Sequence, residues 1–172
     1  MPAIRPATVV LLGMMGSGKT TVGRALAART GWRYLDNDDL VRTVTGRAPE
    51  EIAATDGEDA LHAAEAEALR YALRVPPPLI VGAAAWVATD PDSVALLRAA
   101  PMVVYLRARP DTLRARVGAG HGRRDDATDL AWLQARHAER DGIYRQLASL
   151  TIDTDESEVE AVVGDILEAL SG

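Results

Sequence analysis

The chain has 172 residues and a formal net charge of −6, with 48% hydrophobic residues and no cysteine. This length suits one domain with a sizeable core, and we expect residues 1–172 to form a single domain. The lack of cysteine excludes disulfides and thiolate metal sites, and it fits a cytoplasmic location. The acidic composition argues against nucleic acid as a partner, and no segment is typical of a membrane anchor. We expect a monomer that binds small molecules, with an oligomer left open.

Short apolar runs alternate along the chain with longer helical segments. The expected strands are 7–12, 33–36, 79–81, 102–106 and 150–153. The expected helices are 19–30, 38–44, 49–55, 58–73, 91–99, 110–117, 129–147 and 156–170. This alternation is typical of an α/β fold, in which a parallel sheet is covered by helices on both faces. We therefore predict a three-layer α/β/α arrangement around a five-stranded parallel sheet.

A phosphate-binding motif follows the first expected strand and opens the first expected helix. Residues 13–20 read Gly-Met-Met-Gly-Ser-Gly-Lys-Thr and match the P-loop pattern G-x-x-x-x-G-K-[ST]. Glycines let the backbone wrap around an anion, so that successive N–H groups point at phosphate oxygens. Lys19 is the single lysine among nineteen cationic side chains, and its ammonium suits the β- and γ-phosphates. The Thr20 hydroxyl suits Mg²⁺, so the motif predicts a nucleoside triphosphate with Mg²⁺.

Carboxylates follow the second expected strand, at Asp36, Asp38 and Asp39. Ligands of parallel α/β sheets bind at the carboxyl ends of the strands, so these side chains should face the same crevice as the P-loop. Asp36 could hold Mg²⁺ directly or through water. Asp38 could accept a hydrogen bond and then a proton from an acceptor hydroxyl. For Asp39 the alternative of a helix cap is equally good.

The segment at about 118–128 contains three glycines, two arginines and two aspartates, and it has almost nothing apolar to bury. We expect this segment to be a mobile lid. The sequence leaves open whether Arg123 or Arg124 is the working residue of the lid.

Together these residues resemble the shikimate kinase family, within the nucleoside-monophosphate-kinase-like P-loop proteins. The similarity covers nearly the whole chain, because further motifs recur in the same order and spacing. These motifs are Thr21-Val22-Gly23-Arg24, Asp36-x-Asp38, Thr45-Gly46-Arg47, Gly57-Glu58, Glu65, Val104-Tyr105-Leu106, the spacing of Arg116 and Arg123, Arg140-x-x-x-Tyr144-Arg145 and Asp153-Thr154.

The resemblance implies a P-loop kinase fold with ATP and Mg²⁺ as cofactors, and transfer of the γ-phosphate of ATP to a hydroxyl of shikimate. It implies a substrate-binding helical region at about 38–73.

The resemblance also implies roles for single residues. Arg140 would hold the substrate carboxylate, Arg116 would lie against adenine, and Arg123 would meet the charge that develops on the phosphoryl group. The implied catalytic residues are Lys19, Asp38 and Arg123, and the implied metal residues are Thr20 and Asp36. The implied cofactor contacts are Gly13, Gly16, Ser17, Gly18, Lys19, Thr20, Thr21 and Arg116. The implied substrate contacts are Asp38, His62, Gly82, Ala83, Ala84 and Arg140.

The acceptor half departs from the family pattern in two places. The chain has Leu61-His62 where the family has Phe-Arg, and Gly82-Ala83-Ala84 where it has three glycines. Histidine cannot make the two-pronged contact of arginine, and alanine methyl groups occupy space and disfavour the positive φ that glycine permits. These departures leave alternatives open: a kinase for a polyol, cyclitol or hydroxy acid, a slow NTP-hydrolysing switch, or a catalytically weak paralogue that binds nucleotide.

Overall fold

The structure is a computed structural model that describes residues 3–118 and 129–172. Its centre is a five-stranded parallel sheet with the strand order β2-β3-β1-β4-β5. The strands are β1 (Thr8–Leu12), β2 (Arg33–Leu35), β3 (Leu79–Gly82), β4 (Met102–Arg107) and β5 (Leu150–Asp153). In the central pairings Val10 lies beside Val81 on one side and Val103 on the other. The predicted α/β class and the five parallel strands are confirmed.

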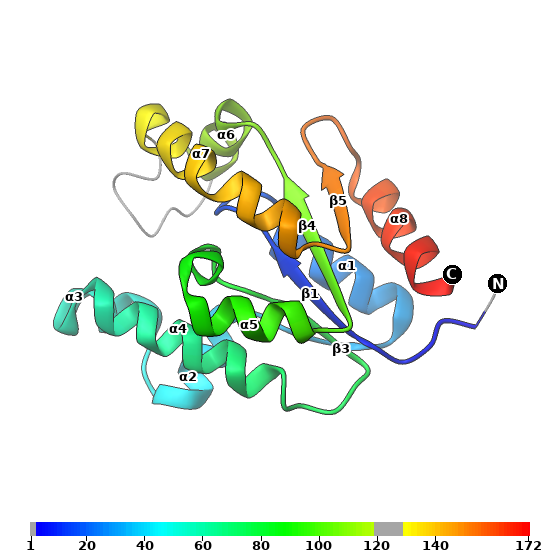
Figure 1. The fold of residues 1–172 in the computed structure, drawn as a ribbon, viewed down its shortest axis with the longest axis horizontal. Helices are drawn as coiled ribbons and strands as arrows, with labels where there is room; N and C mark the ends of the chain where they lie inside the picture. The colour runs from blue at the N-terminus through cyan, green and yellow to red at the C-terminus, as the bar shows by residue number, and fades with distance from the viewer. Residues whose placement is uncertain (1–2, 119–128) are drawn as a thin grey trace.

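Helices cover both faces of this sheet (Figure 1). They are α1 (Lys19–Thr30), α2 (Asn37–Thr45), α3 (Pro49–Asp56), α4 (Glu58–Ala72), α5 (Pro91–Ala99), α6 (Pro110–Gly118), α7 (Leu130–Leu147) and α8 (Val159–Ser171). One core cluster joins Val9 and Leu11 to α1 and α8, and the other joins Val10 and Leu12 to helices on the opposite face. Successive residues of a strand point to opposite faces, so β1 supplies both clusters and the predicted three layers are confirmed.

Two local features differ from the sequence-based expectation. A short 3-10 helix, η1 (Ala85–Thr89), follows β3, where no element was expected, because five residues are too few to show a helical period. The last helix begins at Val159 rather than at residue 156. In the segment before it, the Ser157 hydroxyl donates to the Asp153 carbonyl at 2.9 Å, and this competes with a helical start.

The predicted lid falls almost entirely outside the described residues. Gly118 ends α6, and residues 119–128, with Arg123 and Arg124, are not described. The lid and the roles of its arginines therefore stay predictions. Among the residues that are described, no helix is long and apolar enough to cross a membrane.

The Tyr34 ring on β2 explains two glycines near the carboxyl edge of the sheet. A Cβ atom on Gly23 of α1 would lie 2.7 Å from Tyr34 Cδ2, and a Cβ atom on Gly82 would meet the Tyr34 hydroxyl. Both contacts are closer than real Cβ atoms allow, so a side chain at either position would force the Tyr34 ring to shift. Burial raises the pKa of Tyr34 well above its ordinary value, so the hydroxyl keeps its proton.

Candidate active site

A cavity of about 1080 Å³ opens at the carboxyl edge of the sheet. It extends from the loop between β1 and α1 to the inner sides of α3, α4 and α7. Most of the predicted site residues line it, namely Gly16, Gly18, Lys19, Thr20, Thr21, Asp36, His62, Gly82, Ala83, Ala84, Arg116 and Arg140. Gly13 and Ser17 are buried members of the loop, and they and Asp38 lie outside the lining. The structure thus brings most of the predicted nucleotide and acceptor residues to one cavity.

The P-loop is held in a conformation that depends on glycine. Gly13, Gly16 and Gly18 have φ values of 153°, 86° and 101°, a region that side-chain-bearing residues rarely adopt. A Cβ atom on Gly13 would also lie 2.6 Å from the Leu106 carbonyl oxygen and would meet the Ser17 hydroxyl. The loop is therefore built by backbone geometry rather than by side-chain packing.

Two polar groups of this loop indicate an anion site. Lys19 Nζ donates to the Gly13 carbonyl at 2.6 Å and to the Met14 carbonyl at 3.0 Å, so the ammonium is held over the loop. The Ser17 hydroxyl is buried and has no hydrogen-bond partner. Leaving a buried hydroxyl unpaired costs free energy, which favours a ligand that pairs with it. The N-terminus of α1 begins at Lys19 and adds a favourable dipole for an anion.

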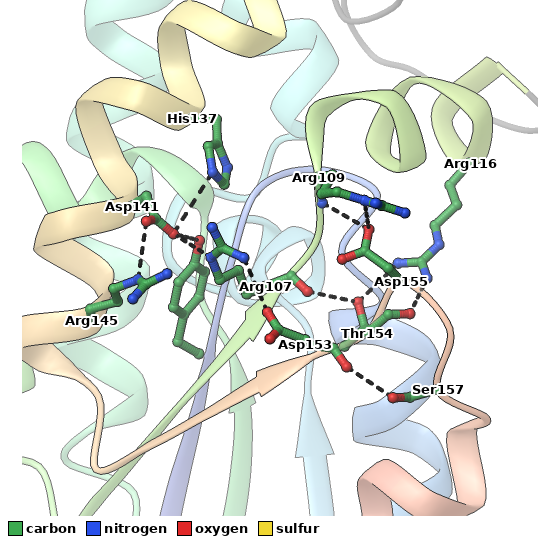
Figure 2. A network of polar contacts seen from close by, with 11 residues as sticks. Arg107, Arg109, Arg116, His137, Asp141, Arg145, Asp153, Thr154, Asp155 and Ser157 are labelled. Carbon is green, nitrogen blue, oxygen red and sulfur yellow. Dashed lines mark hydrogen bonds and ion pairs between the residues drawn. The ribbon is translucent and has the colours of Figure 1, made fainter.

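Arg116 closes one end of the cavity. Its guanidinium donates to the Gly16 carbonyl at 3.3 Å and to Thr154 at the hydroxyl (3.1 Å) and the carbonyl (2.5 Å). Figure 2 shows Arg116 reaching from α6 to Thr154, just after β5. Arg116, which the family resemblance places against adenine, therefore ties the P-loop to the end of β5. Thr154 is buried and was not predicted as a site residue, although the Asp153-Thr154 pair was part of the resemblance.

Asp36 and Asp38 take different positions at the start of α2. Asp36 is the N-cap residue of α2, and it lines the cavity next to the P-loop. Asp38 is half-buried in the first helical turn and accepts a hydrogen bond from Asn37 Nδ2 at 3.4 Å. In the described part of the chain, no group of three or more His, Cys, Asp or Glu side chains could hold a metal. A magnesium ion here would depend on Thr20, Asp36 and phosphate oxygens, which suits Mg²⁺.

Arg140 is a buried cation at the acceptor end of the cavity. It lies on α7 with 8% of its surface exposed, and its Nη1 is 3.8 Å from the Met14 sulfur. Its Nε has no hydrogen-bond partner. One turn later the Tyr144 hydroxyl donates to the Ala85 carbonyl at 2.6 Å, which fixes α7 against η1. A buried guanidinium with an unpaired donor is suited to an anionic ligand such as a carboxylate.

His62 is part of an aromatic wall that the sequence did not reveal. Its ring stacks on Trp86 with centroids 4.2 Å apart and planes 9° apart, and its Nε2 lies 3.4 Å from Glu58 Oε1. His62 comes from α4, whereas Trp86 comes from η1. Trp86 was not predicted as a site residue, and the signal available was a large aromatic residue directly after the alanine run. The stack gives this side of the cavity a flat surface.

Ala83 and Ala84 replace family glycines, and the backbone at Ala84 shows no strain. Ala84 has φ −64° and ψ 146°, an ordinary extended conformation. Ala83 and Ala84 are both buried, and both line the cavity. The expectation that alanine disfavours a positive φ agrees with Ala84, where this chain uses a negative φ and so carries no strain. The methyl groups still occupy space in the cavity wall.

The family model and curated relatives indicate one family. The model of the shikimate kinase family matches residues 15–171. A shikimate kinase of Moorella thermoacetica is 37% identical over 169 residues, with 96% of this chain and 95% of that protein covered. One of Symbiobacterium thermophilum is 38% identical over 167 residues, covering 94% of this chain and 95% of the relative.

Solved structures give the same relationship. The shikimate kinase of Acinetobacter baumannii, solved in complex with shikimate, superposes with a TM-score of 0.85 at 25% sequence identity. The superposition covers 97% of this chain and 94% of that one.

Proposed function

The chain belongs to the shikimate kinase family, and we propose that it transfers the γ-phosphate of ATP to a hydroxyl of shikimate. The observation that carries the proposal is Arg140, a buried guanidinium with an unpaired Nε in the same cavity as a complete P-loop. Phosphoryl transfer to a small carboxylate needs an anchor for the carboxylate and a cradle for the phosphates. This cavity offers both.

At the nucleotide end, the P-loop N–H groups and the N-terminus of α1 would bind the phosphates. Lys19 lies over the loop, from which its ammonium would reach the β- and γ-phosphates. Thr20 and Asp36 would hold Mg²⁺, which neutralises phosphate charge when bound. Arg116 would lie against adenine, supported by its contacts with Thr154. These residues orient the γ-phosphate toward the acceptor.

At the acceptor end, Arg140 would bind the shikimate carboxylate with two parallel N–H donors and so orient the ring. Asp38 would accept the proton of the attacking hydroxyl as its oxygen bonds to the γ-phosphorus and ADP leaves. Asp38 is not part of the cavity lining, whereas its neighbours Asp36 and Asn37 are. Arg123 would meet the developing charge, and it lies outside the described residues.

A second candidate is favoured by the wall of His62 and Trp86. The stacked rings stand where the family has a second arginine, so the cavity offers fewer cationic donors for a carboxylate. Such a wall also suits a cyclitol, a polyol or another hydroxy acid, which would need only hydroxyl contacts and ring packing. Both candidates keep the same nucleotide end.

Release of ADP in a coupled assay separates these candidates. We expect turnover that depends on shikimate, with less use of quinate-like acids and least use of neutral polyols. An Arg140→Lys variant should keep ATP binding and raise the KM for shikimate, because lysine cannot form the two-pronged contact. Turnover with a neutral polyol that exceeds turnover with shikimate would favour the second candidate, and turnover without any acceptor would contradict both.

We further infer a cytoplasmic protein that acts as a monomer. The lack of cysteine supports a cytoplasmic location, because cytosolic proteins rarely depend on disulfides for stability. Size-exclusion chromatography with light scattering tests the monomer, because a dimer would double the measured mass.

A further inference from the structure

A polar network beside the cavity joins α7 to the sheet directly next to Arg140. Asp141 Oδ1 accepts a hydrogen bond from the Tyr105 hydroxyl at 2.9 Å and one from Arg107 Nε at 2.9 Å. Tyr105 and Arg107 belong to β4, whereas Asp141 belongs to α7. Figure 2 shows Asp141 facing Arg107 across the gap between helix and strand. None of these three residues lines the cavity.

The two ends of this link are partly shielded from water. The side chains of Arg107 and Asp141 are 23% and 20% exposed, so their attraction is screened less than that of a surface pair. Although burial opposes it, the hydrogen bonds from Tyr105 and Arg107 hold the pKa of Asp141 below its ordinary value. The carboxylate is thus charged at neutral pH, and the link is a charge-assisted one.

Arg107 is itself fixed from the other side. Its Nη1 lies 3.2 Å from Asp153 Oδ1, and its main-chain carbonyl accepts from Thr154 N at 2.8 Å. Both partners lie at the end of β5, so Arg107 is anchored to the sheet by a second strand (Figure 2). A side chain held in this way can hold a helix in turn.

We propose that Arg107 and Asp141 are positioning residues that set the rotation of α7 against β4 and thereby place Arg140 for the acceptor. The inference rests on the proposed function of Arg140. A guanidinium lies roughly 6 Å from the axis of its helix, so a rotation of about 10° moves it by about 1 Å. A shift of that size is enough to cost a large factor in binding or rate.

Arg145 provides a matched control for Arg107. Its Nε lies 3.0 Å from Asp141 Oδ2, so it contacts the other oxygen of the same carboxylate. Arg145 is on α7 itself, four residues after Asp141, and its side chain is 54% exposed. It therefore cannot tie the helix to the sheet. Arg107→Met and Arg145→Met each remove one cation from the same carboxylate, but only the first removes a contact between α7 and the sheet.

The test compares the KM values for shikimate and ATP in these two variants, with calorimetry of shikimate binding as a second readout. Arg107→Met should raise the KM and Kd for shikimate about ten-fold. The KM for ATP should stay within about two-fold, because the carbonyl that Thr154 contacts is main chain and survives the substitution. Arg145→Met should change neither value by more than about two-fold. Arg107→Lys should recover part of the loss.

Equal effects of Arg107→Met and Arg145→Met, or equal rises in both KM values, would overturn the inference. If Arg107→Met does not fold, Asp141→Asn and Tyr105→Phe replace it, since each keeps the shape of its side chain. Each should raise the shikimate KM more than the ATP KM, and a rise confined to ATP would also overturn the inference. A wild-type protein without shikimate turnover would instead contradict the proposed function.

Discussion

The two ends of the cavity are built in different ways. At the nucleotide end the main chain determines the geometry of the site. Three glycines have positive φ, and main-chain carbonyls accept hydrogen bonds from Lys19 and Arg116. At the acceptor end the contacts come from side chains on α4, η1 and α7, which meet only after folding. A site made of backbone tolerates little change in its local sequence. A site made of distant side chains can change its ligand while the fold stays the same.

The largest effect should come from the cation at the backbone-built end. Lys19→Met should lower kcat by about 10³-fold or more with every acceptor, because the loop still forms but the ammonium over the phosphates is lost. Circular dichroism should show an unchanged fold. The control is Arg29→Met, which removes an exposed cation from the same helix and should have no effect. Wild-type turnover by Lys19→Met would show that the P-loop assignment is wrong.

The next effect should separate chemistry from nucleotide binding. Asp38→Asn should lower kcat by about 10²-fold while leaving the affinity for ATP within about two-fold, because its proposed partner is the acceptor hydroxyl. Asp39→Asn is the matched control, since Asp39 is the next residue and its side chain is 75% exposed. Single-turnover kinetics measure the chemical step, and a separate binding measurement gives the affinity for ATP. A parallel loss of ATP affinity would move Asp38 to the nucleotide end.

A smaller effect should come from the aromatic wall. His62→Arg should lower the KM for shikimate by about ten-fold, because it adds a charge-assisted contact and a guanidinium also stacks on indole. The control is His62→Gln, which keeps a neutral polar side chain and should bring no gain. Steady-state kinetics with shikimate provide the measurement. Tight and fast use of shikimate by the unmodified protein, with no benefit from His62→Arg, would refute the idea that this wall weakens carboxylate recognition.

The smallest effect should come from restoring a glycine at the acceptor end. Ala84→Gly should change the shikimate KM by less than about two-fold, because Ala84 already has ordinary backbone angles and only its methyl group is removed. It should lower the free energy of unfolding by about 0.4–1 kcal/mol through the entropy of the unfolded chain. Gly13→Ala at the nucleotide end should instead abolish turnover. Equal effects of the two substitutions would remove the contrast between the ends.

The nucleotide end could be predicted because its determinants are local. The P-loop, the strand before it and helix α1 are contiguous in sequence, and α1 begins and ends at the predicted residues, Lys19 and Thr30. Arg140 is different, because only the family resemblance gave it a role. No local pattern separates it from other arginines of α7, and its burial depends on how that helix packs.

The wall and the network escaped prediction for the same physical reason. His62 and Trp86 stack across two elements, and Arg107 and Asp141 are 34 positions apart in the chain. Such pairs depend on the rotation of one element against another, which hydrophobic periodicity does not determine. The residues at 62 and 83–84 were visible in the sequence as departures from a family pattern. The stacking of His62 on Trp86 and the backbone angles of Ala84 could be seen only in the folded structure.

The Tyr34 ring makes three positions depend on one another in mutational terms. Side chains at Gly23 and Gly82 are both blocked by this one ring, so a smaller residue at position 34 would release two sites at once. This is epistasis with a steric cause. Gly82 lines the acceptor cavity, so a library that varies it alone meets the Tyr34 hydroxyl in every variant. A library that varies positions 34 and 82 together changes the part of the cavity wall formed by residue 82. It therefore gives directed evolution a route to new acceptors.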